Sequence, residues 1–317
     1  MLYNLAIVIY DFFVHLAAPF SRKPRKMMKG HWVVYELLRQ QVEKGEQYIW
    51  FHAASLGEFE QGRPLIEMIR EKYPNYKILL TFFSPSGYEV RKHYRGADIV
   101  CYLPFDKPRN VKKFLDIANP CMAFFIKYEF WKNYLDELHK RRIPVYSVSS
   151  IFRRDQIFFK WYGGTYRNVL KDFDHLFVQN EASKRYLSKI GISRVTVVGD
   201  TRFDRVLDVR NQARELPEFE RFVGERCQTL IAGSSWPQDE EILIPYFNEH
   251  PEMKLIIAPH EIHREHLMYI ESLLKRPSVR LSDVFHDQSL AEGKDCLIVD
   301  SFGLLSSIYR YGTIAYI

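Results

Sequence analysis

The chain has 317 residues, of which 47% are hydrophobic and 26% are charged, and its net charge at pH 7 is +6. This length suits two α/β domains of roughly 150 residues each, and the composition excludes a disordered or low-complexity chain. The charge favours anionic partners such as phosphates, acidic sugars or a membrane surface, whereas no basic patch with interleaved aromatic residues points to nucleic acid.

The first 20 residues predict an amphipathic helix with a wide apolar face. They are apolar apart from Asn4, Asp11 and His15, which fall within one narrow arc of a helix with 3.6 residues per turn. A basic cluster follows directly and consists of Arg22, Lys23, Arg25, Lys26 and Lys29. Because a signal peptide has its positive charges before the apolar run, no cleavage is expected.

The same order of residues predicts where this segment lies. By the positive-inside rule, the basic cluster holds the domain that follows on the cytoplasmic side of the membrane. Residues 1–30 are therefore expected to form an anchor helix and basic segment at the inner (cytoplasmic) membrane. Asp11 favours a shallow, partly embedded helix over a spanning one. The alternative is a soluble amphipathic helix that packs on its own domain.

No metal site is expected from the cysteines and histidines. The cysteines lie far apart, without a C-x-x-C pair, at Cys101, Cys121, Cys227 and Cys296. This spacing indicates a reducing compartment and no metal. His260, His263 and His266 lie close together, but no carboxylates accompany them at H-E-x-x-H spacing, so they do not indicate a metal either.

From Tyr48 onward, short apolar runs alternate with amphipathic helical stretches, which is typical of parallel sheets built from βα units. The first domain, 31–215, has expected strands at 49–54, 77–83, 99–104, 122–128, 144–150, 175–180 and 195–200. A charged stretch leads to the second domain, 216–317, with expected strands at 229–235, 254–260, 279–283, 296–301 and 313–317. We expect a GT-B fold, in which two doubly wound Rossmann-like domains face a cleft, although other two-domain enzymes share this pattern. Because the last run ends at Ile317, the second domain is expected to be incomplete.

Glu58 is the first candidate site residue. It follows the strand at 49–54 within the first turn of a helix, at the carboxyl edge of the sheet where ligands bind. A carboxylate there can act as a general base if a dry cleft raises its pKa, and Gly57 would allow close approach of a substrate. However, Ser55 and Glu58 also have the spacing of a capping box, which is a structural device.

Further candidates follow other strands of the first domain. The hydroxyl-rich turn at 81–87 opens a helix whose free N–H groups could hold a phosphate, although such turns are common helix caps. Lys127 and Glu129 could form an ion pair, a surface fringe or part of the site. Arg202 could clamp a phosphate with its planar guanidinium, or it could be a solvated partner of Asp204.

Polar loops of the second domain predict a nucleotide pocket. Ser234 follows one expected strand, Pro259 and His260 end the next, and Phe302 and Gly303 follow a third. The sequence contains neither a G-x-G-x-x-G that opens a helix after a strand nor a G-x-x-x-x-G-K-[ST]. The sequence therefore argues against dinucleotide oxidoreductases and P-loop enzymes.

The motifs together resemble those of the 3-deoxy-manno-octulosonic acid (Kdo) transferases of lipopolysaccharide synthesis, the family-30 glycosyltransferases, along essentially the whole chain. FHAASLGEFE is similar to the family's H-[AS]-x-S-x-G-E, LLTFFSPSGYE to its T-x-[TS]-P-[TS]-G, and YLPFDKP to a further signature. KYEFWKN resembles E-T-E-L-W-P-N, VVGDTRFD resembles G-x-x-K-F-D, APHEIHRE resembles P-R-H-P-E-R, and VDSFGLLSSIY resembles G-D-T-x-G-E-L-x-x-x-Y.

The resemblance implies roles for residues of the first domain. Glu58 would be the general base, and Arg202, at the family's Lys, would stabilise charge on the leaving phosphate. Lys127 stands where the family has the first Glu of E-T-E-L-W, so the charge is reversed. Either Glu129 takes over that role or this chain uses a cation.

The resemblance also implies the substrates and the reaction. Pro259, His260, Phe302, Gly303 and Leu304 match positions that bind CMP in the family, and Ser234 would join them, whereas the later H-N-x-L-E motif is absent. Kdo would pass with inversion from CMP-Kdo to the lipid A precursor, without a metal or other cofactor. Two alternatives remain: a GT-B transferase that uses another nucleotide sugar, or a catalytically inactive, membrane-associated lipid-binding protein.

Overall fold

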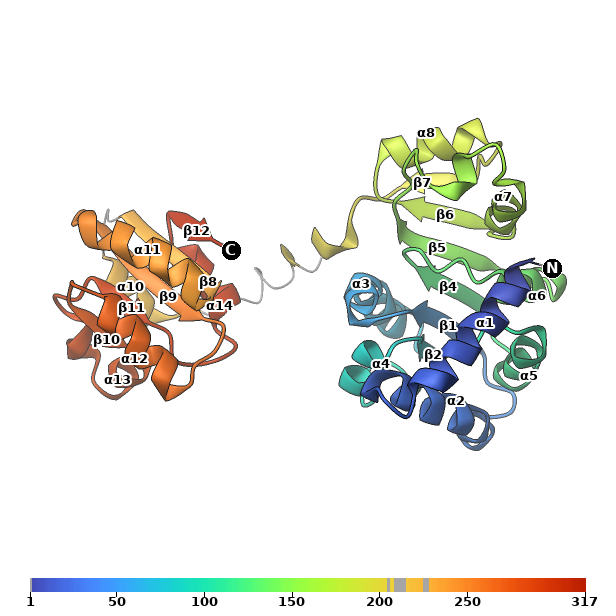
Figure 1. Ribbon diagram of the computed structural model, residues 1–317, viewed down its shortest axis with the longest axis horizontal. Coiled ribbons are helices and arrows are strands. Elements are labelled where there is room, and N and C mark those ends of the chain that lie inside the picture. Colours follow the sequence, from blue (N-terminus) through green and yellow to red (C-terminus); the bar gives the residue numbers. More distant parts are fainter. Residues whose placement is uncertain (1, 204–205, 208–214, 225–227) are drawn as a thin grey trace. The chain divides into compact units, whose positions relative to one another are not determined.

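The computed structural model describes residues 2–203, 206–207, 215–224 and 228–317. The chain forms two compact units, residues 1–205 and 206–317 (Figure 1). The predicted boundary after residue 215 follows the stretch 208–214, which lies outside the described residues, as do Asp204 and Cys227.

Unit 1 is built on a sheet in which every pair of neighbouring strands is parallel. Its order is β3-β2-β1-β4-β5-β6-β7, which reverses direction at β1 as expected of a doubly wound sheet (Figure 1). The strands are β1 Tyr48–Ala53, β2 Lys77–Phe82, β3 Ile99–Tyr102, β4 Met122–Ile126, β5 Val145–Ser150, β6 His175–Val178 and β7 Val195–Val197. Because helices cover both faces, these strands are almost continuously apolar rather than alternating.

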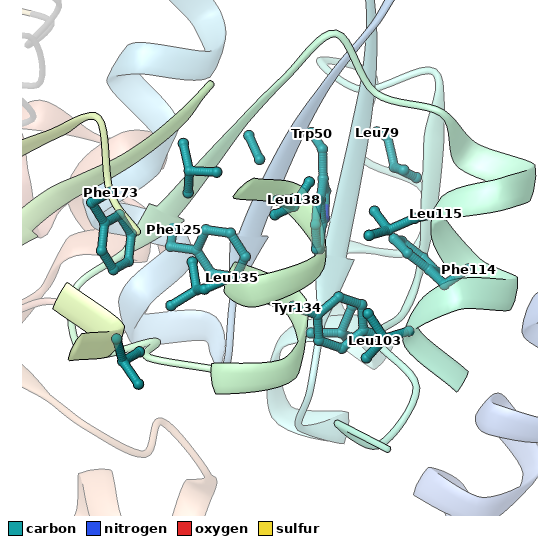
Figure 2. Packing of buried hydrophobic residues seen from close by; sticks show 14 of the residues in the cluster. Trp50, Leu79, Leu103, Phe114, Leu115, Phe125, Tyr134, Leu135, Leu138 and Phe173 are labelled. Atoms are coloured by element: carbon teal, nitrogen blue, oxygen red, sulfur yellow. The ribbon is translucent and has the colours of Figure 1, made fainter. Parts of the chain in front are cut away.

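The helices of unit 1 place one apolar cluster on each face of the sheet. They are α1 Leu2–Ala17, α2 Arg22–Gln41, α3 Leu56–Lys72, α4 Pro85–Arg91, α5 Pro108–Ala118, α6 Lys132–Lys140, η1 Ile157–Phe159, α7 Gly164–Lys171 and α8 Glu181–Lys189. Trp50 of β1 packs with Phe114, Tyr134 and Leu135 on one face, as Figure 2 shows. Its neighbour Phe51 packs on the opposite face, with residues of α3. Successive strand residues thus hold helices on both sides.

Unit 2 repeats the architecture with a parallel sheet of order β10-β11-β9-β8-β12. Its strands are β8 Gln228–Ser235, β9 Met253–Pro259, β10 Ser278–Arg280, β11 Cys296–Ile298 and β12 Ile314–Tyr316. Its helices are α10 Pro217–Val223, α11 Pro237–Glu249, α12 Arg264–Leu273, α13 Leu281–His286, η2 Gln288–Ala291, α14 Leu305–Ile308 and η3 Tyr309–Tyr311. The predicted α/β class with two doubly wound parallel sheets is confirmed.

Helix α1 attaches to unit 1 through its polar side. The Tyr3 hydroxyl donates to Asp106 Oδ2 (2.6 Å), Asn133 Nδ2 donates to Asn4 Oδ1 (2.8 Å), and Lys107 forms an ion pair with Asp11. Most of the large apolar side chains of the helix are exposed, namely Leu5, Val8, Ile9, Tyr10, Phe12, Phe13 and Leu16, whereas Val14 is buried with Met27 and Phe105. This orientation is the reverse of a helix that packs its apolar stripe on a core.

The described helices have lengths and compositions that bear on the predicted membrane anchor. No single one of them is long and apolar enough to cross a bilayer, but α1 and α2, which meet at a 115° bend, satisfy the criteria as a pair. The predicted membrane anchor therefore stays a prediction.

Helix α2 joins α1 to the sheet through the buried His31. The imidazole of His31 packs edge-to-face on Phe105, with ring centroids 4.5 Å apart, and close to Phe83 and Tyr102. Burial lowers the pKa of His31 to about 4, although the nearby Asp11 carboxylate acts in the opposite direction. The folded protein therefore holds this ring neutral through a pH range in which an exposed histidine becomes charged.

This burial predicts a measurable sensitivity to acid. Since the pKa of His31 is about 4 in the fold and about 6.5 in the unfolded chain, its contribution to stability is complete above about pH 6.5 and falls as the pH drops towards 4. His31→Phe keeps an aromatic ring without the titration. Between pH 7 and pH 4.5, we expect the wild type to lose about 2–3 kcal/mol more unfolding free energy than this variant, measured by urea denaturation. Equal losses would contradict this expectation.

Candidate functional site

The candidate site lies at the carboxyl edge of the unit 1 sheet. Because all its strands are parallel, the loops after β1, β4, β5 and β7 emerge along the same edge. The segments that begin at this edge carry Glu58, Lys127, Glu129 and Arg202. The fold thus brings to one edge the residues of the first domain that the sequence singled out.

Glu58 lies in the first turn of α3, and it is partly buried beside the exposed Gly57. The Ser55 hydroxyl donates to the Glu58 carboxylate, and the Ser55 side chain makes no capping hydrogen bond to a helix N–H group. The full capping box is therefore not formed. The carboxylate lies near the positive end of the α3 dipole, which stabilises its charge, and it is hydrogen-bonded rather than ion-paired.

Glu129 belongs to a chain of buried hydrogen bonds that the sequence did not predict. The Trp50 indole donates to Thr81 Oγ1 (2.8 Å), which lies 2.9 Å from His52 Nδ1. His52 Nε2 is 3.2 Å from Glu129 Oε2, and the Trp131 indole donates to the same oxygen (2.6 Å). His52 Nδ1 also lies 3.2 Å from Thr81 O, and the Trp131 indole also donates to His52 Nε2 (3.1 Å), so both ring nitrogens have polar partners.

This hydrogen-bond chain explains the position of Glu129. His52 and Thr81 are completely buried at neighbouring positions of β1 and β2, so they provide a fixed support at the end of the sheet. Glu129 remains partly exposed at the far end of the chain. One residue in the sequence could have indicated this hydrogen-bond chain, namely His52 in the FHAASLGE motif, three residues before Ser55. A buried histidine in a strand needs partners, and here they come from two other segments.

Lys127 is held in an unusual backbone conformation, with φ of 69°. Its N–H donates to Val148 O (2.8 Å), and its carbonyl accepts from the Ser150 hydroxyl (2.6 Å). Its ammonium lies 5.8 Å from the centre of the Tyr128 ring and helps to lower the pKa of Asp200. Lys127 and Glu129 therefore have different surroundings, and Lys127 contributes a positive charge towards the loop after β7.

Arg202 pairs with Asp200, and its other predicted partner, Asp204, lies outside the described residues. Its Nη2 is 2.6 Å from Asp200 Oδ2, and hydrogen bonds from Arg202 hold the pKa of Asp200 below its usual value. The guanidinium is still well exposed to solvent. Between these two residues, Thr201 donates to Gln61 O (2.7 Å) in α3. Since Gln61 lies one turn after Glu58, this bond ties the Arg202 segment to the helix that carries Glu58.

The predicted donor residues lie at the carboxyl edge of the unit 2 sheet. Ser234, the last residue but one of β8, is exposed and has φ of 55°. His260, which follows Pro259 at the end of β9, stacks on the Trp236 ring with centroids 4.4 Å apart. After β11, Phe302 is exposed, Gly303 has φ of 86°, and Leu304 caps α14. The sequence did not single out Trp236, whose partly exposed ring covers one face of the His260 ring.

The neighbouring histidines have structural partners. The His263 side chain caps α12 by accepting from the His266 N–H, and His266 Nε2 lies 2.8 Å from the buried Glu240, which also accepts from Ser235 (2.9 Å). Within the part of the chain that the structure describes, no three His, Cys, Asp or Glu side chains are placed to hold a metal ion.

Two units of this kind, each a parallel sheet with polar loops at its carboxyl edge, define a protein of the GT-B type. Solved structures with this fold include the UDP-GlcNAc 2-epimerase from Neisseria meningitidis bound to UDP-GlcNAc (TM-score 0.54, 13% identity, 85% of this chain and 76% of that chain). Another is MurG from Acinetobacter baumannii (TM-score 0.50, 9% identity, 85% of this chain and 70% of that chain). At these identities, the likeness shows the fold alone.

The chain belongs to the Kdo transferase family. The family described as "3-Deoxy-D-manno-octulosonic-acid transferase (kdotransferase)" matches residues 30–205, which is more than half of the chain. The resemblance that the motifs indicated is thereby confirmed.

Curated relatives agree with this assignment. A bifunctional glycosyltransferase/methyltransferase of Fusobacterium nucleatum is 26% identical over 86% of this chain and 44% of its own length. The 3-deoxy-D-manno-octulosonic acid transferase of Rickettsia felis is 26% identical over 85% of this chain and 58% of its own length. The enzyme of the same name from Chlamydia trachomatis serovar D is 24% identical over 98% of this chain and 74% of its own length. The chain thus spans about half the length of the first two relatives.

The buried hydrogen-bond chain predicts that Glu129 supports the fold of unit 1. Glu129→Ala removes the carboxylate that accepts from the Trp131 indole and contacts His52 Nε2, so we expect it to lower the unfolding free energy by about 1–3 kcal/mol. Glu129→Gln retains an acceptor oxygen and should cost clearly less. Urea denaturation followed by tryptophan fluorescence checks both variants. An alanine variant as stable as the glutamine variant would show that the hydrogen bonds of Glu129 contribute little.

Proposed function

We propose that the chain provides the acceptor-binding unit and part of the donor-binding unit of an enzyme that transfers Kdo from CMP-Kdo to the lipid A precursor, with inversion. Membership of the Kdo transferase family carries this proposal. The chemistry requires a base for the attacking hydroxyl, a positive charge for the departing phosphate, and a surface for the nucleotide. The residues at the two carboxyl edges suit these three tasks.

Glu58 is the proposed base. It has one hydrogen-bond donor, Ser55, and no cation shares its carboxylate among the described ion pairs. An oxygen that is free of a strong ion pair can accept the proton of a sugar hydroxyl as that hydroxyl attacks the anomeric carbon. Gly57 leaves open space beside it, because an added Cβ would approach only the Ser55 hydroxyl, at 3.9 Å. An acceptor sugar can therefore come close to the carboxylate.

Arg202 and Lys127 are proposed to offset the charge on the leaving CMP. Both cations act on Asp200 in the absence of substrate, as its lowered pKa indicates. A phosphate that approaches this loop could compete with Asp200 for the exposed guanidinium, which suits bidentate contact with phosphate oxygens. Lys127, where the family has a Glu, would then add a second cation at this loop. Glu129 would hold the site in place through its contacts with His52 and Trp131. No metal is required by this arrangement.

Unit 2 is proposed to hold the nucleotide of CMP-Kdo. The stacked Trp236 and His260 rings offer a flat aromatic surface to a cytosine base. Pro259, Ser234 and the turn at 302–304 would supply backbone and hydroxyl contacts at the same sheet edge. The left-handed conformation of Gly303 allows a backbone to approach a ligand closely.

The role of Glu58 can be tested by a single substitution. Glu58→Gln retains the size and a hydrogen-bonding side chain but removes the base, so kcat should fall about 100-fold or more. Glu71→Gln, at the exposed end of the same helix, is the matched control and should retain activity. Kdo transfer from CMP-Kdo generated in situ to lipid A precursor is measured with this chain and with a form that continues past Ile317. Activity that survives Glu58→Gln in the active form would assign Glu58 a structural role only.

We also propose that unit 1 docks on the cytoplasmic face of the inner membrane through α1. The exposed apolar face of this helix and the basic cluster after it match an interfacial helix, in which apolar residues enter the acyl region and cations meet anionic headgroups. The polar contacts with Asp106, Lys107 and Asn133 would hold the helix on the unit while its apolar face stays outside. The lipid acceptor would then be within reach of the site.

This docking predicts a loss of membrane affinity when the apolar face is made polar. Replacing Phe12 and Phe13 together by Ser removes two exposed aromatic side chains, each worth about 1.5 kcal/mol or more when buried, so binding to lipid vesicles should weaken about 100-fold. Ile242→Ser removes a comparably exposed side chain from α11 and should leave binding unchanged. Vesicle co-sedimentation measures both variants. Unchanged binding of the Phe12 and Phe13 variant would rule out docking through α1.

A further inference from the structure

We propose that a cationic cavity on unit 1, away from the candidate site residues, binds the phosphate of an anionic phospholipid headgroup. The cavity has a volume of about 730 Å³. Four cations line it: Arg154 and Lys160 from the segment after β5, Arg167 from α7 and Lys189 from α8. This inference rests on the proposed docking of unit 1 on a membrane, to which it adds a second contact with a defined ligand.

The charges in this cavity are not compensated by the protein. None of its four cations forms an ion pair with another described residue, whereas Arg63, Arg70 and Arg141 of the same unit each pair with a carboxylate. A single carboxylate, Asp155, also lines the cavity, so its net charge is positive. Like charges held close together repel one another, and an anion between them removes that cost. Phosphate is the anion that Arg and Lys recognise best in combination.

The walls of the cavity favour an amphiphile over a free ion. Phe159, Tyr186 and Ile190 line it beside the cations, and the Phe159 and Tyr186 rings lie 5.6 Å apart. Lys189 sits over the Tyr186 ring at 5.8 Å. Apolar walls gain nothing from inorganic phosphate, but they can contact the glycerol and upper acyl carbons of a phospholipid.

An exposed aromatic tip adjoins the cavity. Trp161 and Tyr162 follow Lys160 directly, and they are 90% and 60% exposed, with ring centroids 5.4 Å apart. The turn that presents them is tight, because a Cβ added to Gly163 would lie 1.8 Å from Ile157 O. Trp and Tyr side chains are enriched at the level of lipid headgroups, where an apolar ring and a polar tip are both satisfied. The tip thus suits insertion beside a headgroup.

The aromatic tip lies next to α1. A second cavity of about 540 Å³ is lined by Tyr3 of α1 together with Tyr162 and Tyr166, so these elements border the same space. The tip therefore lies near the first turn of α1, and the proposal places both on one membrane surface. Two separated contacts would fix the orientation of unit 1 on that surface, which a single helix lying in the interface does not do.

The test compares vesicles of phosphatidylcholine alone with vesicles that also contain phosphatidylglycerol. We expect the wild-type chain to prefer the anionic vesicles. The double variant Arg154→Gln/Arg167→Gln should lose about 30-fold in affinity for them, at about fivefold per cation, while it binds phosphatidylcholine vesicles as before. The double variant Lys44→Gln/Lys72→Gln removes the same charge from other exposed positions of unit 1 and should keep the preference. Trp161→Ala should weaken binding to both kinds of vesicle.

Several outcomes would overturn the proposal. If the Arg154 and Arg167 variant retains the preference for anionic vesicles, the cavity does not bind the headgroup. If millimolar inorganic phosphate removes that preference as completely as the double variant does, the cavity is a site for soluble phosphate. Failure of docking through α1 is separable, since it appears as unchanged binding of the Phe12 and Phe13 variant to phosphatidylcholine vesicles. Failure of Kdo transfer affects neither vesicle measurement.

Discussion

The buried hydrogen-bond chain that runs from Trp50 through Thr81 and His52 to Glu129 fixes the edge of the sheet on which the candidate site depends. Each of its polar groups lies in a segment that is otherwise apolar, where an unsatisfied group would be costly. These hydrogen bonds therefore permit few arrangements of the loops after β1 and β4. Glu58 lies five residues after Ala53, which ends β1, so the same hydrogen bonds help to fix its position.

The attachment of α1 through its polar side has a different consequence. A helix held by Tyr3, Asn4 and Asp11 leaves its apolar residues outside the fold, and such exposure is stable only when another apolar phase covers them. The proposed docking on a membrane would supply that phase and would place Glu58, the proposed base, near the lipid acceptor. The cationic cavity and the Trp161 tip are proposed as a second membrane contact on unit 1.

The sequence was sufficient to predict the strands, the helices and the α/β class, because apolar runs of four to eight residues between amphipathic stretches indicate parallel strands locally. It also placed Glu58, Lys127, Glu129 and Arg202 at one edge. It could not supply partners that come from distant segments: Glu129 bonds His52, 77 residues away, and Thr201 bonds Gln61, 140 residues away. The left-handed backbone of Lys127 is another such feature, since it is imposed by Val148 and Ser150 of the neighbouring strand.

The identity of the transferred sugar is the most direct test of the proposed function. Lipid A precursor is incubated with the active form of the protein and, in separate reactions, with CMP-Kdo or with UDP-sugars, and the product is analysed by mass spectrometry. We predict that the acceptor gains Kdo from CMP-Kdo and gains no sugar from UDP donors. Transfer of a different sugar from a UDP donor, or no transfer from CMP-Kdo by any form of the protein, would contradict the account.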